Sequence, residues 1–370
     1  KIGMFYDTHS MMYQLDTKPD LTKDDNRDLF YELINDFYSV IPSKYIARIN
    51  NKPIVWFYVA SYIENYDSNI FKYAEKRFKN DFEEKGLYVV KESSWNKAEA
   101  DDVYTWGSAL KGPTFKSIIS VGPGFDNTAV EGKNFKIRQR ENGKFYKDSW
   151  KKALVKSKHE DHNIIAIETW NEYHEGTNIS ESKEYGRKYL KLSKKYIEKF
   201  KNEIMPENFP GKKFFSDDKV SINFTNRDYN KGIKYIEVGD GKNEVVKYDG
   251  YNCLKPLETK HEGKYMYFKI NPMYKINKGE NYKITVEYYD SDFEKFLLQY
   301  DSTDDSDELN GAYKSSEIIF SENTKEWKEN TFIIKDAKFE SRQNEGADFR
   351  IKAFNKKLYI KSIVIEYEGF

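Results

Sequence analysis

The chain is poor in several residues on which whole classes of protein depend. Of its 370 residues only Cys253 is a cysteine, which excludes an intramolecular disulfide, and its five histidines show no zinc-ligand spacing. It has no run of about 20 apolar residues, which a membrane-spanning helix needs. Its 61 Lys and Arg residues balance 61 Asp and Glu residues. Because the chain has no net basic charge, we expect no nucleic-acid partner.

What the sequence does contain is an alternation of apolar strands and amphipathic helices over its first half. Strands are expected at 2–8, 53–59, 87–92, 103–106, 117–121 and 164–170, and helices at 24–40, 69–85, 150–156 and 182–201. Such alternation indicates an α/β fold, a parallel sheet covered by helices. We predict a (β/α)8-type TIM barrel over residues 1–204. Closure needs eight strands, so either the first units precede residue 1 or two strands are missed.

The pattern changes after residue 204. Residues 205–214 contain Pro206, Pro210 and Gly211 and are expected to form a linker. From 215 to 370, strands recur without a convincing amphipathic helix, among them 264–270, 282–288, 293–300, 327–334, 349–354 and 358–367. This predicts an all-β sandwich domain. We interpret it as a carbohydrate-binding domain attached to the barrel; a structural buttress without a ligand is the alternative.

One motif carries most of the chemistry. Directly after the apolar strand at 164–167, Glu172 and Glu175 lie three residues apart with His174 between them. Two acids beside aromatic residues at the mouth of a buried strand are what cleavage of a glycosidic bond requires. Residues i and i+3 of a strand point to opposite faces, so both acids can face one pocket only if the strand ends near Asn171 and the chain turns. A solvated loop with two surface acids is the other interpretation.

Three segments carry a family resemblance, in the family's own order. Residues 120–128 read Ser-Val-Gly-Pro-Gly-Phe-Asp-Asn-Thr, residues 140–143 read Arg-Glu-Asn-Gly and precede Tyr146 and Trp150, and residues 171–177 read Asn-Glu-Tyr-His-Glu-Gly-Thr. They resemble the S-V-G-P-G-[YF], R-x-x-G-x-x-Y and N-E-W-H-E-G-[ST] motifs of glycoside hydrolase family 99, the endo-α-mannosidases. The resemblance is clear over about residues 117–179. The second half separately looks like sandwich domains appended to bacterial polysaccharide-degrading enzymes.

The resemblance implies catalytic roles for the two acids. Glu172 matches the family's base and Glu175 its acid. The implied reaction is retaining: the base deprotonates the sugar 2-hydroxyl, which displaces the leaving group through a 1,2-anhydro sugar, and the acid protonates the leaving oxygen and later activates water. It requires Glu172 ionised and Glu175 protonated. Tyr173 stands where the family usually has Trp, so glycoside hydrolysis is a firmer expectation than the particular sugar.

Further candidates follow from the rule that barrel chemistry sits at the carboxyl ends of strands. The predicted substrate-binding residues are Asp7, His9, Trp95, Tyr104, Trp106 and Asp126, with Asn171 and His174 from the motif itself. Aromatic rings stack on the C–H faces of sugars. Each of these residues could instead cap a loop or pack beneath one, and His174 either orients a catalytic acid or is structural.

No cofactor is expected, with one qualification. Asp301, Asp304, Asp305, Asp307 and Glu308 cluster at a density that can hold Ca²⁺. Their spacing is not that of an EF-hand, and a solvated acidic loop is the other interpretation.

Together these patterns predict a monomeric, secreted or cell-surface bacterial glycoside hydrolase that acts on a polysaccharide or a glycoprotein glycan. The chain opens directly on an apolar strand with no visible signal segment, so we expect it to be an excerpt of a longer precursor. A glycosidase with an Asn-Glu acid on its fourth strand is mimicked by Asn171-Glu172, but the single helix that follows argues against it. A different class, a non-catalytic glycan-binding protein on a barrel scaffold, stays open.

Overall fold

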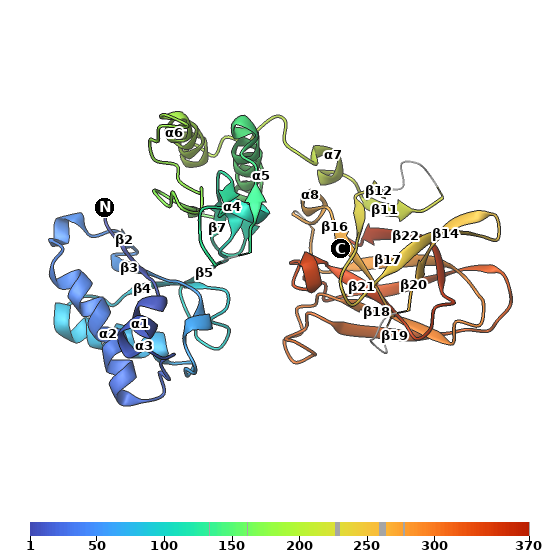
Figure 1. Ribbon diagram of the computed structural model, residues 1–370, viewed down its shortest axis with the longest axis horizontal. Coiled ribbons are helices and arrows are strands. Elements are labelled where there is room, and N and C mark those ends of the chain that lie inside the picture. The colour runs from blue at the N-terminus through green and yellow to red at the C-terminus, as the bar shows by residue number, and fades with distance from the viewer. Residues whose placement is uncertain (133, 161, 226–229, 259–263, 277, 370) are drawn as a thin grey trace. The chain divides into compact units, whose positions relative to one another are not determined.

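Each half of the chain folds around its own core. The computed structural model describes residues 1–132, 134–160, 162–225, 230–258, 264–276 and 278–369. The chain divides into two units, Lys1–Glu207 and Asn208–Phe370 (Figure 1). The segment expected to be a linker, 205–214, straddles this boundary, and its last residues form part of the one-turn helix α7, Lys212–Phe215.

The first unit is built on parallel strands that follow one another in chain order. One sheet contains β1 (Met4–Tyr6), β3 (Lys52–Phe57), β4 (Tyr88–Glu92) and β5 (Asp102–Tyr104), each parallel to the next. A second sheet contains β7 (Ile119–Val121) and β10 (Ile165–Ile167), also parallel. A hydrogen bond from the Ile118 amide to the Val103 carbonyl, 3.0 Å, joins the two sheets. All six expected strands are therefore present, although within the described residues β10 does not pair with β1 and the complete barrel stays a prediction.

Short strands and helices connect these parallel strands. The short strands are β2 (Arg48–Ile49), β6 (Thr114–Phe115), β8 (Phe125–Asp126) and β9 (Ile137–Arg138). The helices are α1 (His9–Leu15), α2 (Asp24–Ser39), α3 (Ile70–Phe82), α4 (Ser108–Lys111), α5 (Lys144–Glu160) and α6 (Lys188–Lys201). None of the described helices is long and apolar enough to cross a membrane.

Two helices differ from their predicted bounds for local reasons. Helix α5 begins at Lys144, well before residue 150, because the positive φ of Gly143 ends a single 3-10 turn and the helix starts immediately. Helix α6 begins only at Lys188, because Ser182 and Gly186 exchange backbone hydrogen bonds and hold residues 182–186 in a separate turn. In both cases the apolar periodicity predicts the helix correctly, whereas the residue at which the helix begins depends on the turn before it.

The second unit consists of two antiparallel sheets, which confirms a β-rich second half. The seven-stranded sheet contains β11 (Lys219–Asn223), β12 (Asn230–Lys231), β14 (Asn243–Tyr248), β15 (Tyr251–Pro256), β17 (Tyr282–Tyr289), β20 (Trp327–Ile334) and β22 (Tyr359–Tyr367). The five-stranded sheet contains β13 (Ile233–Ile236), β16 (Lys264–Ile270), β18 (Lys295–Tyr300), β19 (Lys314–Phe320) and β21 (Phe349–Ala353). Ile284 and Ile363 of the first sheet share one core with Phe268 and Ile351 of the second. A single helical turn, α8 (Pro272–Lys275), follows β16.

Two acids of the cluster at 301–308, Asp301 and Asp304, are bonded within this scaffold. Asp301 is fully buried, where it accepts hydrogen bonds from Arg342 Nε at 2.6 Å and from the Glu340 amide at 2.7 Å. Asp304 is paired with Lys314 at 2.8 Å. Among the described residues, no three His, Cys, Asp or Glu side chains are grouped as metal ligands. The Ca²⁺ interpretation is therefore not supported here.

Replacing Asp301 with alanine is expected to destabilise the second unit. The substitution leaves the Arg342 guanidinium and two backbone amides without their buried acceptor. Loss of one partner of a buried ion pair typically costs about 3 kcal/mol of unfolding free energy. Urea denaturation checks the value, and millimolar CaCl₂ should leave the melting temperature of the unsubstituted chain unchanged. A large calcium-dependent rise would instead restore the metal-site interpretation.

Candidate active site

The first unit has a cavity of about 470 Å³ where the chain leaves four of its parallel strands. Its lining includes Tyr58 after β3, residues of the Trp106–Lys111 segment after β5, Phe125 and Asn127 after β7, and Glu168, Glu175 and Thr177 after β10. These are the carboxyl ends of the strands, where parallel α/β folds place their chemistry. The cavity is therefore the natural candidate for an active site.

The acidic motif does turn as its spacing requires. The Thr177 amide donates to the Glu172 carbonyl at 3.1 Å, and the Gly176 amide donates to the Tyr173 carbonyl at 3.2 Å. Gly176 has φ +58°, and a Cβ at this position would meet Asp126 at 3.3 Å. The Glu175 carbonyl accepts from the Asp126 amide at 2.8 Å, which ties the turn to the loop after β7.

The turn separates the two predicted catalytic acids. Glu175 is half-buried and is one of the residues that line the cavity. Glu172 is exposed, as are Asn171 and His174, and none of the three lines the cavity. The expectation that both acids face one pocket is met only for Glu175 within the described residues, because the Glu172 backbone carbonyl closes the turn while its side chain faces solvent.

A buried arginine fixes the segment that follows Glu175. The Arg140 guanidinium donates to the Gly176 carbonyl at 2.8 Å and to both the backbone and side-chain oxygens of Asn178 at 3.0 Å. Its centre lies 4.3 Å from the ring centroid of Tyr185 and 4.4 Å from that of Tyr189. A buried cation needs such acceptors and ring faces. Arg140, which belongs to the resemblance segment at 140–143, thus acts on the site through the backbone.

Replacing Arg140 with alanine should destabilise the first unit by about 3 kcal/mol, because the carbonyls of Gly176 and Asn178 lose a shared charged donor while remaining buried. Tryptophan fluorescence during urea unfolding reports mainly on this unit, which holds five of the six tryptophans. Arg187→Ala is the matched control, because Arg187 is exposed and its pair with Glu181 spans 3.8 Å. Equal, small effects of the two variants would contradict the role assigned to Arg140.

A carboxylate that was not predicted also lines the cavity. Glu168, 4% exposed, accepts hydrogen bonds from the amides of Gly107 at 3.0 Å and Ala109 at 3.3 Å. Burial raises its pKa to about 7, although hydrogen bonds from the 107–109 segment act in the opposite direction. Glu168 and Glu175 are therefore the two carboxylates at this cavity. The sequence signal was slight: Glu168 is the first acid after the β10 strand.

The raised pKa of Glu168 predicts a pH dependence of stability. The folded chain holds this proton more tightly than the unfolded chain, whose glutamate pKa is near 4.5. The stabilisation is thus complete below pH 4.5 and is lost as the pH rises through about 7, with an amplitude of at most about 3 kcal/mol. Glu168→Gln should flatten this slope in tryptophan-monitored unfolding between pH 4 and pH 8, whereas Glu198→Gln on the exposed side of α6 should not. Identical slopes in both variants would contradict the assignment.

Of the other predicted residues, Trp106 fits its expected place best. It is half-buried, lines the cavity and packs edge-on against Tyr58, with ring centroids 5.2 Å apart. Tyr58 itself was not predicted; burial is the main cause of its raised pKa, and the charges of Glu175 and Asp7 contribute. Asp7 is exposed at the end of β1 and does not line the cavity.

The remaining candidates lie elsewhere. His9 stacks on Tyr62 with centroids 4.3 Å apart. Asp126 is exposed, and hydrogen bonds from Thr128 hold it in a turn and lower its pKa; its neighbour Asn127 lines the cavity instead.

Two predicted binding residues are corrected by their burial. Trp95 is 0% exposed, and its indole Nε1 donates to the Tyr58 carbonyl at 2.6 Å. Tyr104 is 2% exposed, and its hydroxyl donates to the Phe57 carbonyl at 3.2 Å. Both are core side chains whose polar atoms are satisfied by backbone, so neither ring is available to a ligand. They position Tyr58 and its strand rather than contacting substrate.

A cavity at the ends of parallel strands, lined by carboxylates and a tryptophan, is typical of enzymes that act on glycosidic bonds. The chain belongs to the family described as a domain of unknown function (DUF5010), whose model matches residues 1–209. It is also similar to the glycoprotein endo-alpha-1,2-mannosidase of Xenopus laevis, with 36% identity over 102 residues. That match covers 23% of this chain and 22% of the relative, so the similarity spans about a fifth of either protein.

Solved structures show fainter similarities. A glycoside hydrolase-like protein aligns at 16% identity and a TM-score of 0.37, covering 51% of this chain and 66% of that one. The C-terminal CBM6 module of a marine laminarinase from Zobellia galactanivorans aligns at 12% identity and a TM-score of 0.23, covering 40% of this chain and 98% of the module. A family 29 carbohydrate-binding module aligns at 16% identity and a TM-score of 0.23, covering 40% and 84%.

Proposed function

We propose that the protein is a glycoside hydrolase that cleaves glycosidic bonds in a polysaccharide or a glycoprotein glycan. The observation that carries this proposal is the position of Glu175. Glu175 lines a cavity at the carboxyl ends of the parallel strands together with Trp106 and Tyr58, and its charge contributes to the raised pKa of Tyr58. An acid next to an aromatic wall suits protonation of a leaving oxygen while a sugar ring is held by stacking. The similarity to an endo-alpha-1,2-mannosidase supports the same class of reaction.

In the proposed mechanism Glu175 is the general acid and Glu172 the base, as in the resemblance to family 99. Glu175 protonates the leaving oxygen while Glu172 removes the proton of the sugar 2-hydroxyl, whose oxygen displaces the leaving group to form a 1,2-anhydro sugar. Glu175, now a carboxylate, takes a proton from the water that opens this ring, and Glu172 returns its proton to the 2-oxygen, so the two inversions give net retention. Trp106 offers a ring face for stacking. Asn171 and His174, on the same exposed turn as Glu172, would contact the substrate from its solvent side.

Glu168 is the competing candidate for the second carboxylate. Unlike Glu172, it lines the same cavity as Glu175. Its amide donors come from the loop that also carries Trp106, so it either acts on substrate or positions that loop. Glu172 is the residue that the family resemblance assigns as the base, whereas Glu168 is a buried acid whose pKa burial raises to about 7. We therefore retain Glu172 as the base and treat Glu168 as the alternative.

We further propose that the second unit serves as an accessory glycan-binding domain and that the protein works as a monomer, secreted or at the cell surface. A non-catalytic glycan-binding protein is the second candidate function. It is favoured by the exposure of Glu172, because the described residues do not assemble both predicted acids around one cavity.

Release of reducing sugar from α-mannans and glycoprotein glycans tests the proposed hydrolase. Glu175→Gln is expected to lower kcat by about 10²–10⁴-fold, the usual contribution of a positioned acid. Glu172→Gln should lower it by a similar factor. Glu198→Gln, exposed on α6, should leave kcat unchanged.

The outcome assigns the second carboxylate as well. A loss in Glu168→Gln with normal activity in Glu172→Gln would transfer the role of base to Glu168. Glycan binding by the unsubstituted chain without measurable hydrolysis would favour the non-catalytic alternative. Hydrolysis that survives Glu175→Gln would contradict the proposed site.

A further inference from the structure

The seven-stranded sheet of the second unit has one face in the core and one outside it. Along β17, Tyr282, Ile284 and Val286 belong to the sandwich core, so Glu287 and Tyr289 lie on the opposite, outer face. Residues paired across neighbouring strands lie on the same face of the sheet. Tyr289 is paired with Trp327 of β20 and with Tyr359 of β22, so these two rings lie on the outer face as well. The pairing therefore identifies which side chains of β17, β20 and β22 lie on the outer face.

Five aromatic side chains form a continuous group on this outer face. They are Tyr248, Tyr251, Tyr289, Trp327 and Tyr359, here called the aromatic strip. Tyr248 stacks on Tyr359 with centroids 3.8 Å apart, and Trp327 lies 5.5 Å from Tyr251 and 5.3 Å from Tyr289. Tyr251 is 42% exposed. The sandwich core lies on the other side of the sheet and does not account for this group, in which Tyr248, Trp327 and Tyr359 are half-buried and Tyr289 is 8% exposed.

Polar groups that already have hydrogen-bond partners border the aromatic strip. Lys361 Nζ bonds Glu287 at 2.6 Å and lies 4.0 Å from the ring centroid of Tyr251. Trp327 Nε1 donates to Asp249 at 2.9 Å. Partly exposed rings next to hydrogen-bonding groups, with the charge of Lys361 already paired to Glu287, match a ligand with C–H faces and hydroxyls. An anionic membrane or polymer would instead call for unpaired cations.

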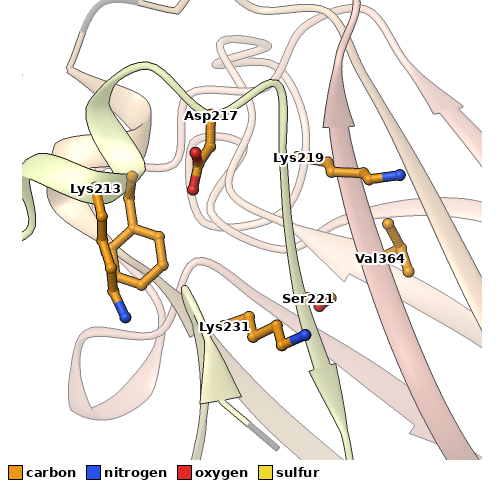
Figure 2. A pocket seen from close by; sticks show the side chains of 7 residues that line it. Lys213, Asp217, Lys219, Ser221, Lys231 and Val364 are labelled. Carbon is orange, nitrogen blue, oxygen red and sulfur yellow. The ribbon is translucent and has the colours of Figure 1, made fainter.

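The same outer face also has a charged hollow, which provides a contrast. Lys213, Lys219, Ser221, Lys231 and Val364 are among the residues that line this space of about 460 Å³ (Figure 2). Figure 2 shows Lys213 on α7 on one side and Lys219 and Val364 on the other. Its lysines are exposed at the surface and no feature of the hollow selects a ligand. It carries no proposal but supplies a matched control.

We propose that the aromatic strip binds a neutral polysaccharide chain, with sugar rings stacked on Tyr251 and Trp327 and hydroxyls bonded to Lys361, Glu287 and Asp249. The inference takes its class of ligand from the proposed function. It concerns binding by the second unit and not hydrolysis by the first, so the two fail separately. A chain that binds glycans without cleaving them would keep this site and lose the hydrolase.

Native affinity electrophoresis tests the site on the full chain carrying Glu175→Gln, which prevents cleavage of the polymer. Gels contain α-mannan, mixed-linkage β-glucan, xylan or no polymer. Retardation is expected in at least one neutral polymer. Tyr251→Ala and Trp327→Ala should each weaken the apparent affinity by about five- to tenfold, which is the range of one stacked ring. Trp327→Phe, which keeps an apolar ring, should recover most of the binding and shows that the sheet is intact.

The controls separate this site from its two competitors. Lys219→Ala combined with Lys231→Ala, in the charged hollow, should leave retardation unchanged. Retardation lost in that double variant, or lost only with Trp106→Ala in the first unit, would place binding elsewhere and overturn the proposal. Absence of retardation in every polymer would also overturn it.

Discussion

The candidate site depends on one buried charge, the guanidinium of Arg140. A buried cation has to be given acceptors, and here they are the carbonyls of Gly176 and Asn178 and the side-chain oxygen of Asn178. These bonds hold the segment immediately after Glu175, while the Asp126 amide holds the Glu175 carbonyl itself. The turn at the end of β10 is therefore fixed from two neighbouring strand ends. The place of Glu175 at the cavity follows from that backbone.

The two units use their aromatic residues differently. In the first unit several of the largest rings are buried in the core. The ring centroids of Trp95 and Phe71 lie 5.1 Å apart, and those of Phe57 and Phe71 lie 4.5 Å apart. In the second unit the core also contains rings, such as Phe268, Tyr282 and Phe349, but a further group of rings lies on the outer face of the seven-stranded sheet. Core packing accounts for many rings in both units, and the aromatic strip on the outer face of the second unit is the part that we assign to a ligand.

Sequence reasoning found the strands well and the environments of single residues poorly. The apolar strings that became β1, β3, β4, β5, β7 and β10 were predicted because burial on both faces leaves a continuous apolar signal. In the second half β16 and β20 were placed correctly, whereas β14 and β15 were missed. β14 and β15 form a hairpin whose turn consists of Asp249 and Gly250, both with positive φ. Charged and apolar residues alternate only weakly along these two strands, so the sequence gives little sign of them.

The site was predicted in part for a related reason. The turn after β10 could be inferred because the i, i+3 spacing of Glu172 and Glu175 is incompatible with a continuing strand. The burial of single side chains could not be inferred from the sequence. Trp95 and Tyr104 follow or end strands as expected, but they are buried in the core. Glu168, which follows a strand and lines the cavity, was overlooked. Which side of a strand end faces the cavity depends on contacts between segments far apart in the chain, such as Glu168 with the Gly107 amide.

The most direct test of the central claim is a crystal structure of the Glu175→Gln chain soaked with an oligosaccharide that the unsubstituted chain cleaves. The account predicts a sugar ring against Trp106 and a glycosidic oxygen within about 3 Å of the residue 175 side chain, hydrogen-bond reach for a general acid. Sugar bound only on the second unit, with the first-unit cavity empty under conditions that saturate cleavage, would contradict it.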